Sequence, residues 1–334
     1  MKGYKMETKR EKFGFTLVEL LTVMSVIAIL IGVLVPALNL VRKMAKDTSQ
    51  KAQFHSISVS LDIYNGEMGE YPESAVKGTS AGYTTGAQRL AEALVGRDML
   101  GFDPMTSWDA YLDNGVTTGT IPYASAALGD PGPEETKSLN RRKGPYLNPE
   151  KIEAHNVGDL YKGTIGAGQV YDGLASNNNK PAPVLTDIYR IRDVTVGSKT
   201  VKAGSPVLYY RANTSLTGST IFPNTQISGI TLTTLTASRT ETQGYIYDSL
   251  DNEDLLALGD VATQTKQHRF DGLTPYTDTA TTENGRWIFY DTITNSKITS
   301  LPRPYNASSY LLISAGYDGI YGTTDDITNF EDAK

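Results

Sequence analysis

Apolar residues are most concentrated in one stretch near the start of the chain. From Phe15 to Val41 the sequence reads FTLVELLTVMSVIAILIGVLVPALNLV. This run of about 27 residues exceeds the roughly 20 that a helix needs to cross a hydrocarbon core. We therefore predict a transmembrane helix over residues 15–41. Proline lacks an amide donor, so Pro36 is expected to unwind or kink this helix between Gly32 and Pro36.

Beyond this run, apolar residues recur every three or four positions, which is the pattern of a helix with one buried face. Asn65-Gly66, followed by Tyr71-Pro72, would end that helix. We predict an amphipathic continuation over residues 42–65, with the polar positions facing water. Its buried face would consist of Phe54, Ile57, Leu61 and Tyr64.

The remainder, residues 66–334, is rich in glycine, threonine and tyrosine and carries short runs typical of β-structure with many turns. The fold class expected is α+β, with the long helix packed on a β-rich globular head. Two short helices are predicted, one from Gly86 or Ala87 to about Val95 and one from Asp251-Asn252 to Gly259. Strands are predicted at 184–191, 206–211, 229–235, 287–290 and 310–314.

Charge is distributed unevenly. Residues 1–14 hold five cations and two acids, a balance of +3, so the remainder carries −6 − 3 = −9. An acidic body lacks the clustered cations that phosphate binding needs, and no nucleic-acid partner is inferred. The chain has no cysteine, so a long loop must be held by packing or by a metal.

The small residue Gly14 precedes the apolar run. In an ordinary secretory signal, the cleavage site follows an apolar region of only 7–15 residues. Cleavage after Gly14 would instead remove a basic leader, residues 1–14, and leave the apolar helix on the mature chain. A plain anchor would have no reason to carry Glu19, because a carboxylate within a membrane span is costly unless it is paired.

The segment Lys12-Phe-Gly-Phe-Thr-Leu-Val-Glu-Leu-Leu21 resembles the cleavage and methylation signature of type IV prepilins and type II secretion pseudopilins. This resemblance implies cleavage between Gly14 and Phe15 by a prepilin peptidase, which also methylates Phe15. It further implies that Glu19 neutralises the Phe15 amine of an adjacent subunit during filament assembly. Pro36 falls where members of this family often carry a helix-bending proline.

The C-terminal segment 314–330 contains acidic residues between glycines. Calcium prefers six to eight oxygen ligands, which a loop of carboxylates and carbonyls can supply, although the spacing is not that of an EF-hand. Two turns with solvated acids are the alternative interpretation. The segment resembles the calcium-binding loop of the major pseudopilin, which favours Ca²⁺. The ligands expected are Asp318, Asp325, Asp326 and, less strongly, Thr328.

An enzyme is not expected, and no catalytic residues are proposed. The three histidines, His55, His155 and His268, lie far apart and share no metal-ligand spacing. The segment Gly163–Gly168 resembles a phosphate loop only superficially.

The resemblance is greatest to the major pseudopilin, with an enlarged head. It implies an inner-membrane protein with a cytoplasmic N-terminus and a periplasmic head. Its partners would be lipid, the assembly platform, minor pseudopilins and further copies of itself in a filament. Two alternatives remain open: a type IV pilin or minor pilin serving adhesion, DNA uptake or motility, and a membrane-anchored ligand-binding β-domain.

Overall fold

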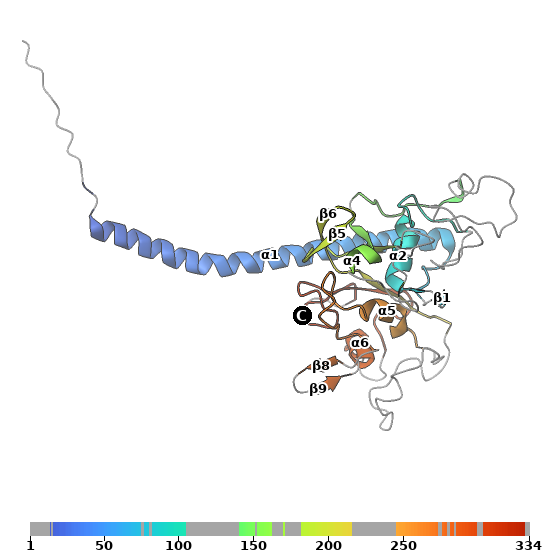
Figure 1. The fold of residues 1–334 in the computed structure, drawn as a ribbon. Coiled ribbons are helices and arrows are strands. Elements are labelled where there is room, and N and C mark those ends of the chain that lie inside the picture. Colours follow the sequence, from blue (N-terminus) through green and yellow to red (C-terminus); the bar gives the residue numbers. More distant parts are fainter. Residues whose placement is uncertain are drawn as a thin grey trace, which may run out of the picture. The chain divides into compact units, whose positions relative to one another are not determined.

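The computed structural model describes Gly14 and residues 16–74, 77–79, 82–104, 140–150, 152–161, 170, 182–215, 245–272, 276–278, 281–283, 285–298 and 303–330. The chain divides into two compact units, Met1–Lys46 and Asp47–Lys334. A long N-terminal helix followed by a β-rich domain gives the α+β, pilin-like fold expected from the sequence (Figure 1). The predicted strand at 229–235 lies outside the described residues.

Helix α1 spans Leu17–Met68 and ends a few residues beyond the predicted Asn65-Gly66. In the first unit its apolar side chains are exposed from Leu17 onward. The helix is continuous through Pro36, so unwinding, one of the two effects predicted there, is not observed. A proline removes only one intrahelical hydrogen bond, and the flanking turns maintain the helix.

In the second unit, α1 presents the predicted apolar face to the core. Phe54, Ile57, Leu61 and Tyr64 are all buried. They share one hydrophobic cluster with Leu90 and other residues of α2, Gly86–Val95. Helix α2 matches its prediction in both position and length.

Five strands form an antiparallel arrangement beside these helices. They are β3 (Ala154–Asn156), β4 (Pro183–Leu185), β7 (Leu208–Arg211), β10 (Tyr310–Ser314) and β11 (Ile327–Thr328). Strand β3 pairs with β4, and β10 lies between β7 and β11. An antiparallel bridge between Thr186 and Pro206 connects the two groups. The predicted strand 310–314 is confirmed, whereas the one predicted over 184–191 ends at Leu185 and β5 begins at Arg192.

Successive residues of β7 and β10 enter different cores. Tyr209 and Leu312 contribute to the cluster that contains α1 and α2. Leu208 and Leu311 contribute to a second cluster, with Tyr247, Leu255 and Phe289. Both faces of these strands are therefore buried, which explains why residues 208–210 and 310–313 are continuously apolar rather than alternating.

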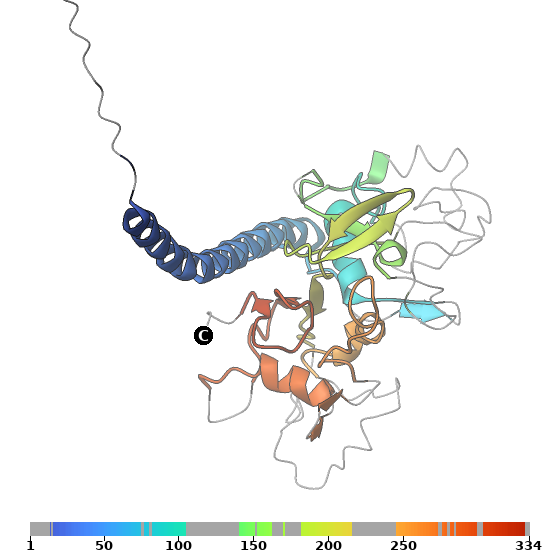
Figure 2. The same ribbon diagram turned by 60° about the vertical axis from the view of Figure 1, so that its left-hand side comes forward.

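The second core is covered by short elements from residues 157–293. They are α4 (Val157–Leu160), η3 (Ser249–Asn252), α5 (Glu253–Leu256) and α6 (Gly285–Ile293). Figure 2 shows α6 on the other side of the head from α2. Three hairpins complete the described head: β1 (Lys77–Thr79) with β2 (Gly82–Thr84), β5 (Arg192–Val196) with β6 (Lys199–Ala203), and β8 (Tyr276–Asp278) with β9 (Thr281–Glu283).

The strand predicted at 287–290 is wrong, because these residues lie in helix α6. The buried positions Arg286, Phe289, Tyr290 and Ile293 follow the three-to-four spacing of a helix. Aromatic and β-branched residues favour strands only weakly, and here burial of one helical face overrides that preference. The short helix predicted from Asp251-Asn252 begins two residues earlier as the 3₁₀ turn η3 and ends at Leu256.

Candidate functional site

The first turn of α1 is closed by hydrogen bonds between Thr16 and Glu19. Glu19 Oε2 accepts from the Thr16 amide at 2.8 Å and from the Thr16 hydroxyl at 2.7 Å. The Glu19 amide donates to Thr16 Oγ1 at 3.2 Å. This reciprocal arrangement is a capping box, in which a Thr and the Glu three residues later satisfy amides that no earlier turn can pair. The Thr-x-x-Glu spacing could have predicted it.

Glu19 is the one charged residue of the apolar run 15–41. The hydroxyls of Thr22 and Ser25 donate to carbonyls of the preceding turn at 3.0 and 2.8 Å, so the helix satisfies them internally. None of the residues in the most apolar part of α1 is buried. The helix is thus long and apolar enough to cross a membrane, although it carries the charged residue Glu19. Phe15 lies outside the described residues, while Gly14 is exposed.

The C-terminal acidic residues hold the turns of their own loop. Asp325 Oδ2 accepts from the amides of Tyr317 and Asp318 at 2.7 and 3.0 Å, and Asp325 Oδ1 accepts from the Thr323 hydroxyl at 2.7 Å. The main chain at Gly316 approaches Asp325 so closely that an added Cβ would lie 2.1 Å from the Asp325 carbonyl oxygen. Asp325 therefore has a structural role in this loop, whether or not the loop binds a metal.

Asp318 and Asp326 each accept one backbone amide, from Ile320 and Gly322 respectively, both at 2.7 Å. The second oxygen of Asp326, Oδ1, is buried and has no hydrogen-bond partner in the described part of the chain. Burial raises the pKa of Asp326 well above its usual value and also raises that of Asp318. Burial would raise the pKa of Asp325 as well, but hydrogen bonds, led by that from Thr323, keep it below the ordinary value.

The described residues contain no group of three acidic or histidine side chains that could hold a metal ion. A cation in this loop would therefore need main-chain carbonyls in addition to the carboxylates. Such a mixture of oxygen ligands suits calcium, and Asp326 Oδ1 is an acceptor that a cation would satisfy. Thr328 lies in β11, opposite Ile313.

Sequence reasoning missed the residues that anchor this loop. The imidazole of His268 is buried; its Nε2 lies 3.0 Å from the Gly259 carbonyl oxygen and its Nδ1 accepts from the Tyr321 amide at 3.3 Å. The backbone amide of Arg269 donates to the Tyr321 carbonyl at 2.9 Å. His268 and Tyr321 are 53 residues apart, and no local pattern links them.

Comparison with family models identifies one match, to the prokaryotic N-terminal methylation motif, over residues 9–35. This motif indicates a type IV pilin-like prepilin. It covers the boundary at Gly14-Phe15, the Thr16–Glu19 capping box and most of the apolar run. No curated protein and no solved structure matches the chain.

A prepilin motif implies processing by a prepilin peptidase and assembly at a membrane into a filament. The apolar helix is consistent with a membrane-anchored prepilin. Such proteins are structural and are not typically enzymes.

Proposed function

We propose that this prepilin is a pseudopilin, a structural subunit of a type II secretion pseudopilus. The observation that carries the proposal is the methylation motif at residues 9–35, which overlaps an exposed apolar helix with one carboxylate. The absence of cysteine and the acidic C-terminal loop favour the secretion system over a surface pilus, since many type IV pilins close their C-terminal region with a disulfide.

The proposed sequence of events begins with insertion into the bacterial inner membrane, with the N-terminus in the cytoplasm and the head in the periplasm. Prepilin peptidase cleaves after Gly14 and methylates Phe15. Lipid solvates the apolar side chains until the assembly platform extracts the subunit, after which the same side chains pack against neighbouring copies and minor pseudopilins. Glu19 then exchanges its hydrogen bonds to Thr16 for the Phe15 amine of a neighbour, because a carboxylate removed from water is attracted more strongly by an opposite charge than by uncharged donors.

Intact mass and N-terminal sequencing after co-expression with a prepilin peptidase test the processing step. A mature chain that begins with methylated Phe15 supports the proposal. An uncleaved chain, under conditions in which a control prepilin is processed, rejects it. Deleting the gene in its host then tests which filament the protein belongs to. Loss of protein secretion with normal surface pili supports the pseudopilus.

A type IV pilin or minor pilin is the second candidate. The observation that favours it is the size of the head, whose second sheet face is covered by elements from residues 157–293. The same deletion distinguishes this candidate, because loss of adhesion, DNA uptake or motility with normal secretion would support it.

We also propose that the loop 314–330 binds Ca²⁺ through Asp318, Asp325 and Asp326, with Thr328 as a weaker ligand. The buried Asp326 Oδ1, which has no hydrogen-bond partner among the described residues, supports this proposal. A bound cation would relieve the repulsion among these carboxylates and hold the loop in place without a disulfide.

A further inference from the structure

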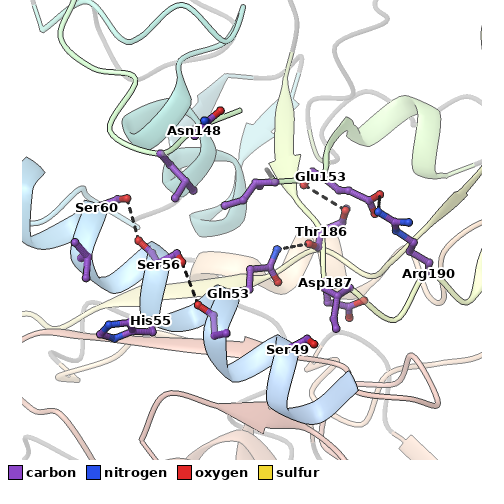
Figure 3. A pocket seen from close by; sticks show the side chains of 15 residues that line it. Ser49, Gln53, His55, Ser56, Ser60, Asn148, Glu153, Thr186, Asp187 and Arg190 are labelled. Atoms are coloured by element: carbon purple, nitrogen blue, oxygen red, sulfur yellow. Dashed lines mark hydrogen bonds and ion pairs between the residues drawn. The ribbon is translucent and has the colours of Figure 1, made fainter. Parts of the chain in front are cut away.

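A groove of about 540 Å³ runs along one side of α1 in the head (Figure 3). One wall is the flank of α1 from Ser49 to Ser60. The other wall comes from two segments distant in sequence, 147–153 ahead of β3 and 186–190 after β4. Successive small residues on α1, among them Ala52 and Ser56, leave room for a ligand beside the helix.

The groove contains two buried acceptors that lack donors. Gln53 Nε2 donates to the Thr186 carbonyl at 2.9 Å, but Gln53 Oε1 has no hydrogen-bond partner among the described residues. Glu153 pairs with Arg190 through Oε1, while its Oε2 also lacks a partner within that set. Thr186 lies between these two side chains in Figure 3. Unpaired buried acceptors destabilise the free protein, so the groove favours a ligand that supplies donors.

A carboxylate oxygen and an amide oxygen together favour a cation. An ammonium carries three donors on a flexible stem and has no acceptor of its own, so it suits a groove that offers only acceptors. A neutral donor would satisfy the hydrogen bonds but gain less from the charge of Glu153.

The chain contains a suitable cation. Arg42, Lys43 and Lys46 form a basic turn of α1 directly after the apolar run. They precede the first acid beyond the membrane segment, Asp47. We propose that the groove receives this basic turn from a second copy of the chain.

The register of neighbouring helices supports this match, and here the argument rests on the proposed filament. Pairing of Glu19 with the Phe15 amine of a neighbour shifts two parallel helices by four residues, or about 6 Å at 1.5 Å per residue. The neighbour's residues 42–46 then lie level with residues 46–50. This position is the end of the groove that begins at Ser49.

Charge exchange in the full-length chain tests the proposal. Glu153→Lys should reduce filament yield about tenfold or more, because it places a like charge opposite the basic turn of the neighbour. Lys43→Glu combined with Lys46→Glu should do the same, and combining all three changes should restore assembly. Glu150→Lys and Lys51→Glu, at exposed positions that do not line the groove, serve as matched controls. Failure of the combined variant to regain yield would overturn the proposal.

Cross-linking provides a second measurement. The chain has no cysteine, so only the introduced thiols can react. Copies with Lys46→Cys are co-expressed with copies carrying Asn148→Cys, a groove residue, and treated with a short bismaleimide. A dimer that exceeds those formed by either variant alone supports the contact. Absence of that dimer overturns it, and the N-terminal mass of the same sample shows independently whether the prepilin was processed.

Discussion

The carboxylate of Glu19 accepts two hydrogen bonds from Thr16 and thereby caps the helix that carries it. The same carboxylate is the proposed partner of a neighbour's Phe15 amine. Its role as a cap and its role as a charge can be separated, because glutamine can also close a capping box but carries no charge.

Replacing Glu19 by Gln should leave the start of α1 intact and abolish the charged pair. We expect normal cleavage after Gly14 and normal membrane insertion. Filament yield should fall about tenfold or more, since hydrogen bonds to charged groups are the stronger ones. Quantitative immunoblotting of sheared filaments measures the effect, and Glu19→Ala should be at least as defective. Normal filament yield in Glu19→Gln would show that only the cap matters.

Asp326→Asn tests calcium binding, because asparagine still accepts the Gly322 amide but removes one charge. For the wild-type protein in detergent, calcium at about 100 times its Kd would add roughly 2.7 kcal/mol of stability. This corresponds to a melting temperature about 5 °C above that in chelator. The variant should lose most of this response.

The difference between calcium and chelator is the relevant readout, because Asp325 and its neighbours also hold the loop without a metal. Asp291→Asn, at an exposed position on α6, should respond like the wild type. An equal response in Asp326→Asn and in wild type would exclude Asp326 as a ligand.

Acid should destabilise the head through His268. Burial, the dominant cause, lowers the pKa of His268 to about 4 from an ordinary 6.5. Between these values the unfolded chain takes up a proton that the folded chain does not, so stability falls as pH falls from about 6.5 to 4. The loss from this one group is on the order of 3 kcal/mol.

The test measures the unfolding free energy by denaturant titration at several pH values, in wild type and in His268→Gln. The variant should be less stable at pH 7 but should lose less stability on acidification. His55→Gln, on the exposed side of α1, is the control and should retain the wild-type slope. Equal slopes for wild type and His268→Gln would show that His268 takes up its proton in the folded head.

Because the sheet has a hydrophobic core on each face, truncating either of two adjacent residues of β10 should destabilise the head to a similar extent. Leu311 and Leu312 point to opposite faces, and both are fully buried. Each Leu→Ala change should therefore cost about 2–5 kcal/mol of unfolding free energy. The exposed Thr195 on β5 provides a control, and Thr195→Ala should cost about 0.5 kcal/mol or less. A negligible cost at Leu311 would show that the second face is not packed.

The features that local sequence predicted well depend on a single hydrophobic periodicity or a single short motif. The apolar face of α1, the short helix α2 and the strand β10 could each be identified from fewer than twenty neighbouring residues. Helix α6 was misassigned because its aromatic residues fit a strand equally well, and only packing against Tyr210 and Phe270 decides the choice.

The contacts that local sequence could not predict join distant segments. The groove combines Gln53 with Glu153 and Thr186, and the C-terminal loop depends on His268. Each requires the chain to be folded before its parts meet. The capping box of Thr16 and Glu19 is different, because its Thr-x-x-Glu spacing is local and could have been predicted. From the sequence alone, Glu19 was interpreted only as the partner of the Phe15 amine.

The position of β10 determines when the head can fold. This strand begins at Tyr310 of a 334-residue chain, yet it lies between β7 and β11 and contributes to both cores. Neither core can close until the last segment of the chain is present. In the proposed topology, with α1 in the membrane, such a head would cross before it folds, because its long-range contacts need the last strand.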